Sequence, residues 1–339
     1  MGFMRAARFT GGMKVCLEEV RTPEPGPGEV RVRVKYCGLC GSERPQYLSG
    51  YHHHQGHEVV GEVEKPGPGV LSVNRGDRVA IYLTAYCGRC AFCRQGLTNL
   101  CSVYSHKMNL GWAVPGGFAE FVVVPENQLM HLREGVSFEA GVLLLDTLGT
   151  PFHGLRLAEP IRAGRPLTKA CVIGCGTVGQ GSIVILQALG AEQILAVDRS
   201  PSRLAQAESL GAVAVPAAPG ALESIAAEGF DLVVEAVGLP GTLAQGIRAV
   251  RPLGTVLGLG ELPERFEIEY DLAMRLKDFF YIRSWYFPLK EFSENQELWL
   301  SGFFSGAGSL ITHILPAERM QEGADLFYGG QSGKVLIEF

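Results

Sequence analysis

Residues 169–200 read KACVIGCGTVGQGSIVILQALGAEQILAVDRS, and this stretch decides the fold of the second half of the chain. It predicts an apolar strand, a glycine turn, a helix and a second apolar strand in succession. Further apolar runs, LVVEAVG at 232–238 and GTVLGLG at 254–260, alternate with Ala- and Leu-rich stretches. Such alternation is typical of a parallel sheet with helices on its faces, so we expect an α/β domain here.

The glycine turn has the spacing of a dinucleotide-binding loop. Gly174 would make the tight turn, Gly176 would let the backbone approach a pyrophosphate, and Gly179 would let the helix pack against the strand. The phosphates would then meet the positive N-terminus of the helix. We assign Thr177 and Val178, which complete the loop, to the same cofactor site.

Asp198 closes the second strand at the distance expected of a carboxylate that binds an adenosine ribose. An ionised carboxylate there repels a 2′-phosphate, so NAD(H) is favoured over NADP(H). Arg199, the next residue, keeps NADP(H) open as the alternative, and we include Arg203 among the cofactor-binding residues. A glycine turn that packs a helix without any nucleotide is the competing interpretation, and strand, helix and acid in register argue against it.

Four cysteines lie within the fifteen-residue run CGRCAFCRQGLTNLC. They are Cys87, Cys90, Cys93 and Cys101. Four thiolates at this spacing can close a tetrahedral shell around one Zn²⁺, which predicts a structural zinc site. Two disulfides are the alternative, but the opening residues MGFMRAARF lack the features of a secretion signal. A nucleic-acid-binding zinc ribbon is disfavoured because 30 Lys and Arg stand against 35 Asp and Glu.

The first 150 residues have a different sequence pattern. EVRVRVKY at 29–36 alternates apolar and polar side chains, and clusters such as PEPGPGE and KPGPGV cut the segment into short pieces. This pattern predicts an all-β, barrel-like domain. The chain has 339 residues with 47% hydrophobic content, which is longer than a single hydrophobic core usually supports. No apolar run approaches the roughly 20 residues of a membrane helix. We therefore expect a two-domain cytoplasmic enzyme that binds neither membranes nor nucleic acid.

A second metal site could be built from Cys40 in YCGLCGSE and His57 in QGHEVVGEV. A thiolate and an imidazole on separate turns are the ligands of an open zinc site, which keeps one position for water or substrate. Taken singly, each residue has a structural interpretation of equal weight: Cys40 could be a small buried side chain, and His57 could be a hydrogen-bonded histidine of a turn. Sequence spacing alone does not bring the two together.

Several motifs occur in one order along nearly the whole chain. They are CGLCGSE, GHEVVGEV, the four-cysteine segment, PGGFAEFVVVP, GCGTVGQG with Asp198, and the closing GKVLIEF. In this combination the chain resembles the zinc-dependent medium-chain alcohol and polyol dehydrogenases. The resemblance implies an α/β protein with a β-rich GroES-like catalytic domain over 1–151 and 289–339. It also implies a Rossmann domain, a doubly wound parallel sheet, over 152–288.

The resemblance implies the catalytic residues. Cys40 and His57 would bind a catalytic zinc, with Glu58 as an occasional ligand. The third ligand of such enzymes precedes the nucleotide domain, and the matching stretch LLLDTLGTPFHG implies Asp146. An acid at this point is typical of the sorbitol and threonine dehydrogenase branches. Ser42 resembles the hydroxyl that passes the alcohol proton toward solvent, and a turn-capping serine is its alternative interpretation.

The chain departs from the family at three points. Glu43 stands where an Asp usually orients the zinc-bound histidine, here His57, and its side chain is one methylene longer. Pro45 occupies the position of a relay histidine, so the proton must pass from Ser42 through water, the cofactor ribose or another side chain. Cys40 and His57 are 17 residues apart, fewer than usual, which predicts a more open pocket suited to a bulky or cyclic polyol.

The segment that fills this shorter connection is SGYHHHQG. Its residues His52, His53 and His54 could touch a substrate or an adventitious metal, and a solvated loop is the alternative. His106 and Trp112, after the cysteine segment, are further candidates for the pocket, although a tryptophan is as often part of the core.

These features predict an oxidoreductase with two Zn²⁺ per chain that transfers hydride between NAD and a secondary alcohol. A sugar, cyclitol or other polyol is the expected substrate, and threonine-type amino alcohol oxidation is the second substrate class. The resemblance also implies a homo-oligomer, a tetramer or a dimer. The alternative is a non-catalytic nucleotide-binding protein on the same scaffold, and retention of Cys40, His57 and Asp146 together argues against it.

Overall fold

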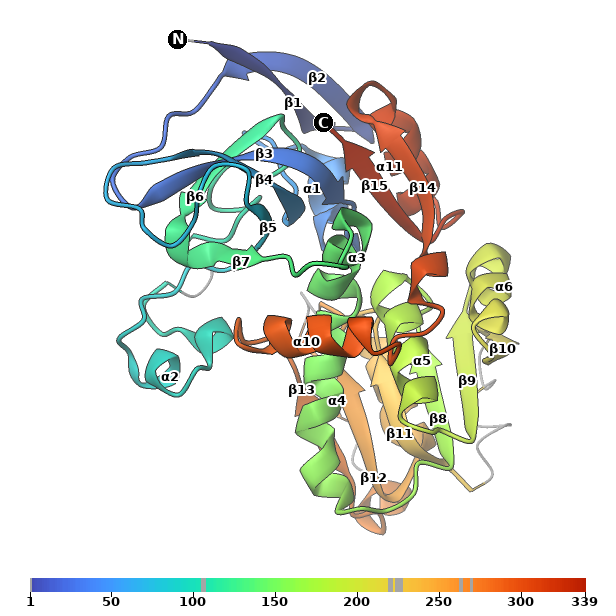
Figure 1. The fold of residues 1–339 in the computed structure, drawn as a ribbon. Helices are drawn as coiled ribbons and strands as arrows, with labels where there is room; N and C mark the ends of the chain where they lie inside the picture. The colour runs from blue at the N-terminus through green and yellow to red at the C-terminus, as the bar shows by residue number, and fades with distance from the viewer. Residues whose placement is uncertain (1, 105–107, 219–221, 223–227, 262–264, 269–270) are drawn as a thin grey trace. The chain divides into compact units, whose positions relative to one another are not determined.

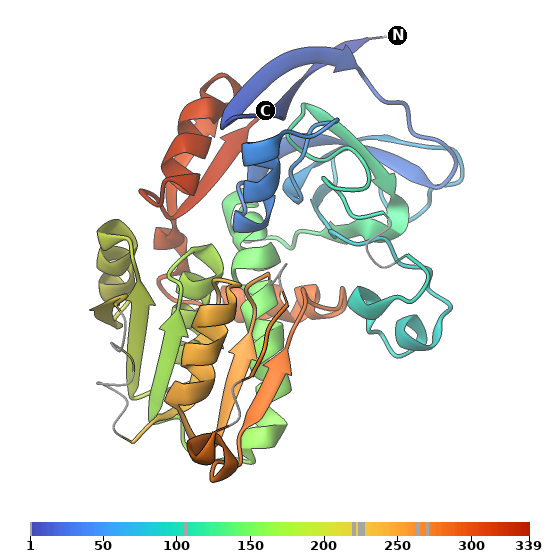
Figure 2. The same ribbon diagram turned by 180° about the vertical axis from the view of Figure 1, so that it is seen from behind.

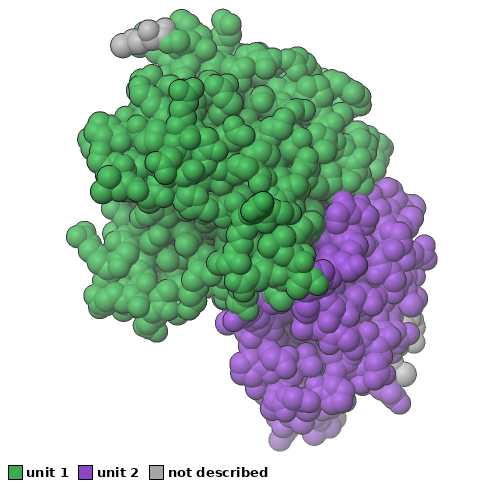
Figure 3. Space-filling model, in the orientation of Figure 1, with its two compact units in different colours: residues 1–146, 288–301, 311–339 green, residues 147–287, 302–310 purple. Residues whose placement is uncertain are grey.

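The chain forms two compact units, coloured separately in Figure 3. Unit 1 contains Met1–Asp146, Pro288–Ser301 and Ile311–Phe339, and unit 2 contains Thr147–Phe287 and Gly302–Leu310. The computed structural model describes residues 2–104, 108–218, 222, 228–261, 265–268 and 271–339. In the described part of the chain, no helix combines the length and the hydrophobicity that crossing a bilayer requires.

Unit 2 is built on a six-stranded, all-parallel sheet with strand order β10-β9-β8-β11-β12-β13. The strands are β8 Lys169–Ile173, β9 Gln193–Asp198, β10 Val213–Pro216, β11 Phe230–Glu235, β12 Val250–Gly258 and β13 Phe280–Arg283. All six residues of β11 are buried, because helices cover both faces of the sheet. The predicted Rossmann-type parallel sheet is confirmed.

Helices pack on opposite faces of this sheet (Figures 1 and 2). The main ones are α4 Gly149–Arg162, α5 Thr177–Ala188, α6 Pro201–Ser209 and α8 Pro240–Ala249, with the short α9 Leu272–Arg275 and η5 Ala307–Leu310. The packed pair α4 and α5 lies on one face, and α8 contacts β11 and β12 from the other. The strand β8, the glycine turn and α5 follow one another as the sequence predicts.

Unit 1 contains a seven-stranded sheet in the order β14-β15-β3-β4-β5-β7, with β6 also paired to β3. Its strands are β3 Glu29–Gly38, β4 Glu58–Pro66, β5 Arg78–Ile81, β6 Phe121–Pro125, β7 Leu129–His131, β14 Ile311–Pro316 and β15 Lys334–Glu338, and a separate antiparallel pair is β1 Phe3–Gly11 with β2 Lys14–Arg21. In β3 the apolar residues of the alternating pattern, from Val30 to Tyr36, are buried. The β-rich domain expected from this pattern is confirmed.

Short helices connect these strands. They are η1 Gly41–Glu43, α1 Arg44–Ser49, α2 Ala91–Arg94, η2 Thr98–Leu100, η3 Glu126–Gln128, α3 Phe138–Val142, α10 Glu291–Leu300, η6 Ala317–Arg319 and α11 Met320–Tyr328. A π-helical turn, η4 Leu143–Thr147, follows α3, and Leu145 within it leaves helical geometry. Asp146 directly follows Leu145 in this irregular turn, and such π-turns are frequent at functional sites.

The C-terminal strand brings distant residues to the end of β3. On β15, Leu336 pairs with Gly38, and on the other side of β3 the same Gly38 pairs with Glu58 of β4. Leu39 N donates to Val335 O at 3.0 Å, which extends the pairing past the end of β3. The start of β15 therefore lies beside the turn that carries Cys40.

Candidate metal centres and nucleotide-binding loop

Four predicted ligands meet inside unit 1. Cys40, His57, Glu58 and Asp146 each offer a ligand atom, and these atoms all lie within 4.8 Å of one another. Cys40 follows β3, His57 and Glu58 stand at the start of β4, and Asp146 lies in the π-helical turn. The structure thus assembles residues that sequence spacing could not.

The distances within this cluster suit a small cation. His57 Nε2 is 2.8 Å from Asp146 Oδ2, and Cys40 Sγ is 3.6 Å from the same oxygen. All three residues are at most 9% exposed. Buried carboxylates and thiolates need a compensating charge, and a thiolate, an imidazole and a carboxylate are ligands that Zn²⁺ accepts. The donor set therefore fits zinc.

The electrostatics of the cluster point the same way. Burial lowers the pKa of His57, but the Glu43 carboxylate, Cys40 and the hydrogen bond to Asp146 raise it, and the net direction is well above its ordinary value. Burial raises the pKa of Asp146, yet its contact with His57 brings the net pKa below the ordinary value. The chain therefore surrounds this point with negative charge, which favours a bound cation.

Glu43 holds the two turns that carry the ligands. Its Oε1 accepts from His57 Nδ1 at 2.9 Å and from Gly56 N at 3.1 Å, and its Oε2 accepts from Cys40 N at 3.3 Å. A proton on Nδ1 leaves Nε2 free to bind a metal. The longer side chain at this position thus reaches His57. Nearby, Ser42 Oγ donates to Cys40 Sγ at 3.3 Å.

The sequence did not reveal the partner of Glu58. Lys334 Nζ donates to Glu58 Oε1 at 2.7 Å, to Oε2 at 2.5 Å and to Leu39 O at 3.1 Å, and both charged side chains are 0% exposed. Burial raises the pKa of Glu58 to about 7 and the Lys334 ammonium opposes this shift. Burial lowers the pKa of Lys334, while Glu58 raises it to a net value above the ordinary one. A lysine placed directly before the apolar run Val335–Ile337 was the available signal.

The Trp112 ring lies against His57. The Trp112 ring centroid is 4.4 Å from that of His57. The Trp112 carbonyl oxygen accepts from Tyr51 Oη at 2.6 Å and lies 3.2 Å from His53 Nε2. With the Gln46 amide oxygen turned toward the indole, Trp112 Nε1 donates to it at 2.8 Å. Sequence reasoning named Trp112 but missed Gln46, which has no distinguishing pattern.

The three-histidine segment makes some of its contacts within its own loop. His53 Nδ1 lies 3.0 Å from the carbonyl oxygen of His54, and His52 is exposed. Burial lowers the pKa of His54 to about 4, so this imidazole is neutral near pH 7. The other candidate, His106, lies outside the described residues.

The four cysteines of the second cluster also converge. The Sγ atoms of Cys87, Cys90, Cys93 and Cys101 lie within 4.8 Å of one another. All four are free thiols, and Cys87 Sγ is 4.0 Å from Cys93 Sγ, about twice a disulfide bond. The structure therefore forms no disulfide among these four cysteines.

Backbone amides point at these sulfurs. Cys90 N donates to Cys87 Sγ at 3.3 Å, Cys93 N to Cys90 Sγ at 3.4 Å and Cys87 N to Cys101 Sγ at 3.4 Å. The amide of Cys93 leads the contacts that lower the pKa of Cys90 to about 5. Because such N–H groups stabilise thiolates, the segment fits one Zn²⁺ held by four sulfurs.

The glycine loop of unit 2 has the shape that a nucleotide requires. Gly174 has φ +92°, a conformation that favours glycine. A Cβ at Gly179 would stand 1.8 Å from Gly174 O, so the helix can close on the turn only without a side chain. A Cβ at Gly176 would meet open space. Thr177 and Val178 form the first turn of the twelve-residue helix α5, where phosphates bind.

Asp198 links the two strands of this loop. Its Oδ2 accepts from Cys175 N at 2.7 Å and its Oδ1 from Ser200 N at 2.8 Å. Each oxygen keeps a second lone pair for a ribose hydroxyl. Arg199 is exposed, and Arg203 is half-buried on α6 with its backbone N–H donating to Ser200 Oγ at 3.3 Å. The loop therefore fits a dinucleotide.

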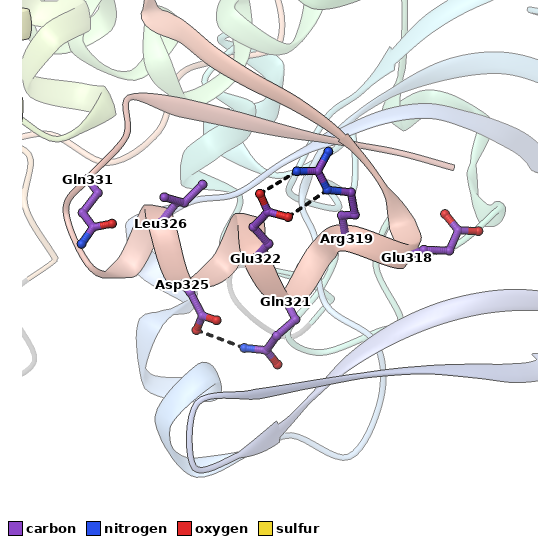
Figure 4. Close-up of a pocket in the computed structure, with 7 residues that line it drawn as sticks. All are labelled: Glu318, Arg319, Gln321, Glu322, Asp325, Leu326 and Gln331. Carbon is purple, nitrogen blue, oxygen red and sulfur yellow. Dashed lines mark hydrogen bonds and ion pairs between the residues drawn. The ribbon is translucent and has the colours of Figure 1, made fainter.

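A surface depression lies along α11 (Figure 4). Its side chains pair with one another: Arg319 holds Glu322 through two hydrogen bonds, and Gln321 donates to Asp325 at 3.0 Å. The depression is lined by neither cysteine nor histidine, so we assign it no chemistry.

Comparisons with known proteins bear on both units. Residues 26–134 match the family described as "Alcohol dehydrogenase GroES-like domain", and residues 177–296 match "Zinc-binding dehydrogenase". The chain is 34% identical to (R,R)-butanediol dehydrogenase of Bacillus subtilis over 74% of this chain and 75% of that protein. It is 28% identical to L-threonine 3-dehydrogenase of Symbiobacterium thermophilum, covering 98% and 97%.

Solved structures agree with these relatives. Galactitol-1-phosphate dehydrogenase from Escherichia coli superimposes with a TM-score of 0.84 at 26% identity, covering 99% of this chain and 100% of that one. The resemblance seen in the sequence is confirmed, and the chain belongs to the zinc-dependent medium-chain dehydrogenase family.

Proposed function

We propose that the protein is an oxidoreductase that uses zinc and NAD to interconvert a secondary alcohol and a ketone, with a sugar, cyclitol or other polyol as its substrate. The observation that carries this proposal is the convergence of Cys40, His57 and Asp146, with the hydroxyl of Ser42 3.3 Å from Cys40 Sγ. In this proposal unit 1 carries the catalytic site, unit 2 binds the dinucleotide, and the chain assembles as a cytoplasmic dimer or tetramer.

Cys40, His57 and Asp146 would hold the catalytic zinc, and the four clustered cysteines would hold the structural one. Bound at the first site, Zn²⁺ supplies a Lewis acid that stabilises negative charge on the alcohol oxygen. Glu43 keeps the proton of His57 on Nδ1 and so orients Nε2 toward the cluster. These contacts support a site whose ligands are positioned before any cation binds.

Ser42 would take the alcohol proton. Its hydroxyl is half-buried and lies beside Cys40 Sγ, where it can both accept and donate. Pro45 has no side-chain group that carries a proton, so the proton would leave Ser42 through water or a cofactor hydroxyl. This relay is the step in which the chain acts as a general base.

The loop at Gly174, Gly176 and Gly179 would bind the pyrophosphate, and Asp198 would bind the ribose. Bound there, NAD⁺ supplies the hydride acceptor. The carboxylate of Asp198 supports NAD over NADP, because a 2′-phosphate would bring a second negative charge against it. Exposed Arg199 is the feature that favours NADP. Comparing turnover with NAD⁺ and with NADP⁺ distinguishes the two cofactors.

The polyol assignment draws on Trp112 and on the relatives. Trp112 is half-buried against His57 and presents a flat apolar surface of the kind on which the C–H face of a sugar ring packs. The names of the three relatives specify a diol, an amino alcohol and a polyol phosphate. Threonine-type amino alcohol oxidation is therefore the second candidate.

The test is NAD⁺ and NADP⁺ reduction, followed by absorbance, with sugars, cyclitols, amino polyols, threonine and simple secondary alcohols, and with zinc counted on the same sample. Two zincs per chain and turnover of one class would support the proposal. Cys40→Ala should abolish turnover and leave NADH binding intact. Full turnover by this variant would contradict the mechanism, and one zinc per chain without turnover would favour a non-catalytic nucleotide-binding protein.

A further inference from the structure

The metal site of unit 1 contains two buried carboxylates, and they differ in their contacts. Asp146 Oδ2 faces the other ligands, 2.8 Å from His57 Nε2 and 3.6 Å from Cys40 Sγ. Glu58 instead has both oxygens hydrogen bonded to Lys334 Nζ, at 2.7 and 2.5 Å. Both acids are close enough to join one cluster, but Asp146 is hydrogen bonded to its other members whereas Glu58 is hydrogen bonded to Lys334.

The fold builds a specific space for this ion pair. Gly38 lies on β3 between β15 and β4, paired with Leu336 on one side and with Glu58 on the other. A Cβ at Gly38 would stand 2.2 Å from Glu58 Oε2, so the carboxylate occupies the space that a side chain would fill. Lys334 Nζ is fixed from a third direction by Leu39 O at 3.1 Å. The lysine is therefore held across the end of β3 against Glu58.

Charge makes this arrangement stable only as a pair. Both side chains are 0% exposed, and a buried carboxylate without a partner is strongly unfavourable. If the ammonium were absent, the nearest available positive charge for Glu58 would be a cation bound by Cys40 and His57. The free carboxylate would then be drawn toward that cation and would compete with substrate for it.

We propose that Lys334 is a positioning residue that selects the ligand set of this site, keeping Glu58 off the metal so that Cys40, His57 and Asp146 bind it and one position stays open for substrate. The inference rests on the proposed function for the identity of the metal site. It assigns a role to a residue that neither touches the substrate nor binds the metal.

Cobalt absorption provides a readout that does not depend on turnover. The labile metal is removed by chelation, one equivalent of Co²⁺ is added, and the spectrum of a Cys40→Ser protein treated alike is subtracted. The d–d bands that remain report the ligands of this one site. Four variants are compared with the wild type: Glu58→Gln, Lys334→Met, the double variant, and Lys334→Arg as the conservative control.

We expect Glu58→Gln, Lys334→Arg and the double variant to retain the wild-type cobalt spectrum. In all three, the side chain at position 58 does not bind the metal. Lys334→Met alone should change the spectrum and lower kcat by about 10 to 100-fold, and adding Glu58→Gln should restore both. The double variant carries no unpaired buried charge, so it shows whether Glu58 is a ligand in the wild type even if a single variant fails to fold.

A changed spectrum in the double variant would show that Glu58 binds the metal in the wild type and would overturn the inference. A wild-type spectrum in folded Lys334→Met would overturn it too, since Lys334 would then only support the fold. These outcomes are separate from the fate of the proposed function: the spectra report the ligand set even if no alcohol is oxidised.

Discussion

Glu43 provides the sharpest test of how the proposed catalytic site is held. Its side chain is 1% exposed and accepts hydrogen bonds from His57 Nδ1, Gly56 N and Cys40 N at 2.9, 3.1 and 3.3 Å. One carboxylate therefore orients an imidazole ligand and both turns that carry the cluster. Glu43→Gln keeps the size of the side chain but replaces one acceptor oxygen by an NH₂ group.

The magnitude follows from these contacts. If the amide oxygen faces His57 and Gly56, its NH₂ meets the N–H of Cys40, and the reverse orientation sets it against the other two donors. A buried donor left unpaired costs about 1–3 kcal/mol. Loss of a group that orients a metal-binding histidine lowers metal affinity by about 10 to 100-fold. We therefore expect zinc affinity at this site to fall by that factor, equivalent to about 1.4–2.7 kcal/mol.

The assay is competition for zinc against a chromophoric chelator, with the four-cysteine site counted separately. Glu235→Gln is the matched control: Glu235 is 2% exposed in unit 2 and accepts from Val237 N, Gly238 N and Thr242 Oγ1. This control should lower thermal stability and leave zinc affinity unchanged. Wild-type zinc affinity in Glu43→Gln, or an equal loss in both variants, would refute the reasoning.

Three further predictions concern the other elements. Cys93→Ser should lower the Tm and the zinc content by one per chain, and an unchanged Tm in calorimetry would rule out the structural-zinc assignment. Asp198→Ala should raise KM for NAD⁺ far more than it lowers kcat, whereas an unchanged KM would remove the ribose contact. Gly179→Ala must displace the turn, because a Cβ there lies 1.8 Å from Gly174 O. We expect it to weaken NADH binding at least about tenfold by fluorescence titration. Tight NADH binding by Gly179→Ala would contradict this account of the loop.

Sites and elements formed by residues close together in the chain were predictable from the sequence. The four cysteines span fifteen residues, and amides of the same segment bond their sulfurs, so the spacing alone carries the site. The glycine loop joins β8 to α5 directly. The alternation of apolar and polar residues in β3 predicts which of its side chains are buried. In each case the interactions are local, so the pattern and the structure coincide.

The catalytic cluster is different because its members are far apart in the chain. His57 and Asp146 are separated by 89 residues and Cys40 and Asp146 by 106. Asp146 was named from the sequence by resemblance, and the π-helical turn that holds it has no recognisable pattern in the sequence. The hydrogen bond between Gln46 and Trp112 likewise depends on how α1 packs against the segment that carries Trp112.

By itself the sequence determined a parallel nucleotide-binding sheet, a β-rich unit, a four-cysteine site and the ligand types of a second metal site. Only the tertiary structure decided how the two carboxylates of that site differ. Lys334 and Glu58 are 276 residues apart and meet because β15 and β4 flank the same end of β3, where Gly38 leaves room for the carboxylate. Strand order and register are properties of the whole sheet, so no local pattern could place that lysine beside the metal ligands.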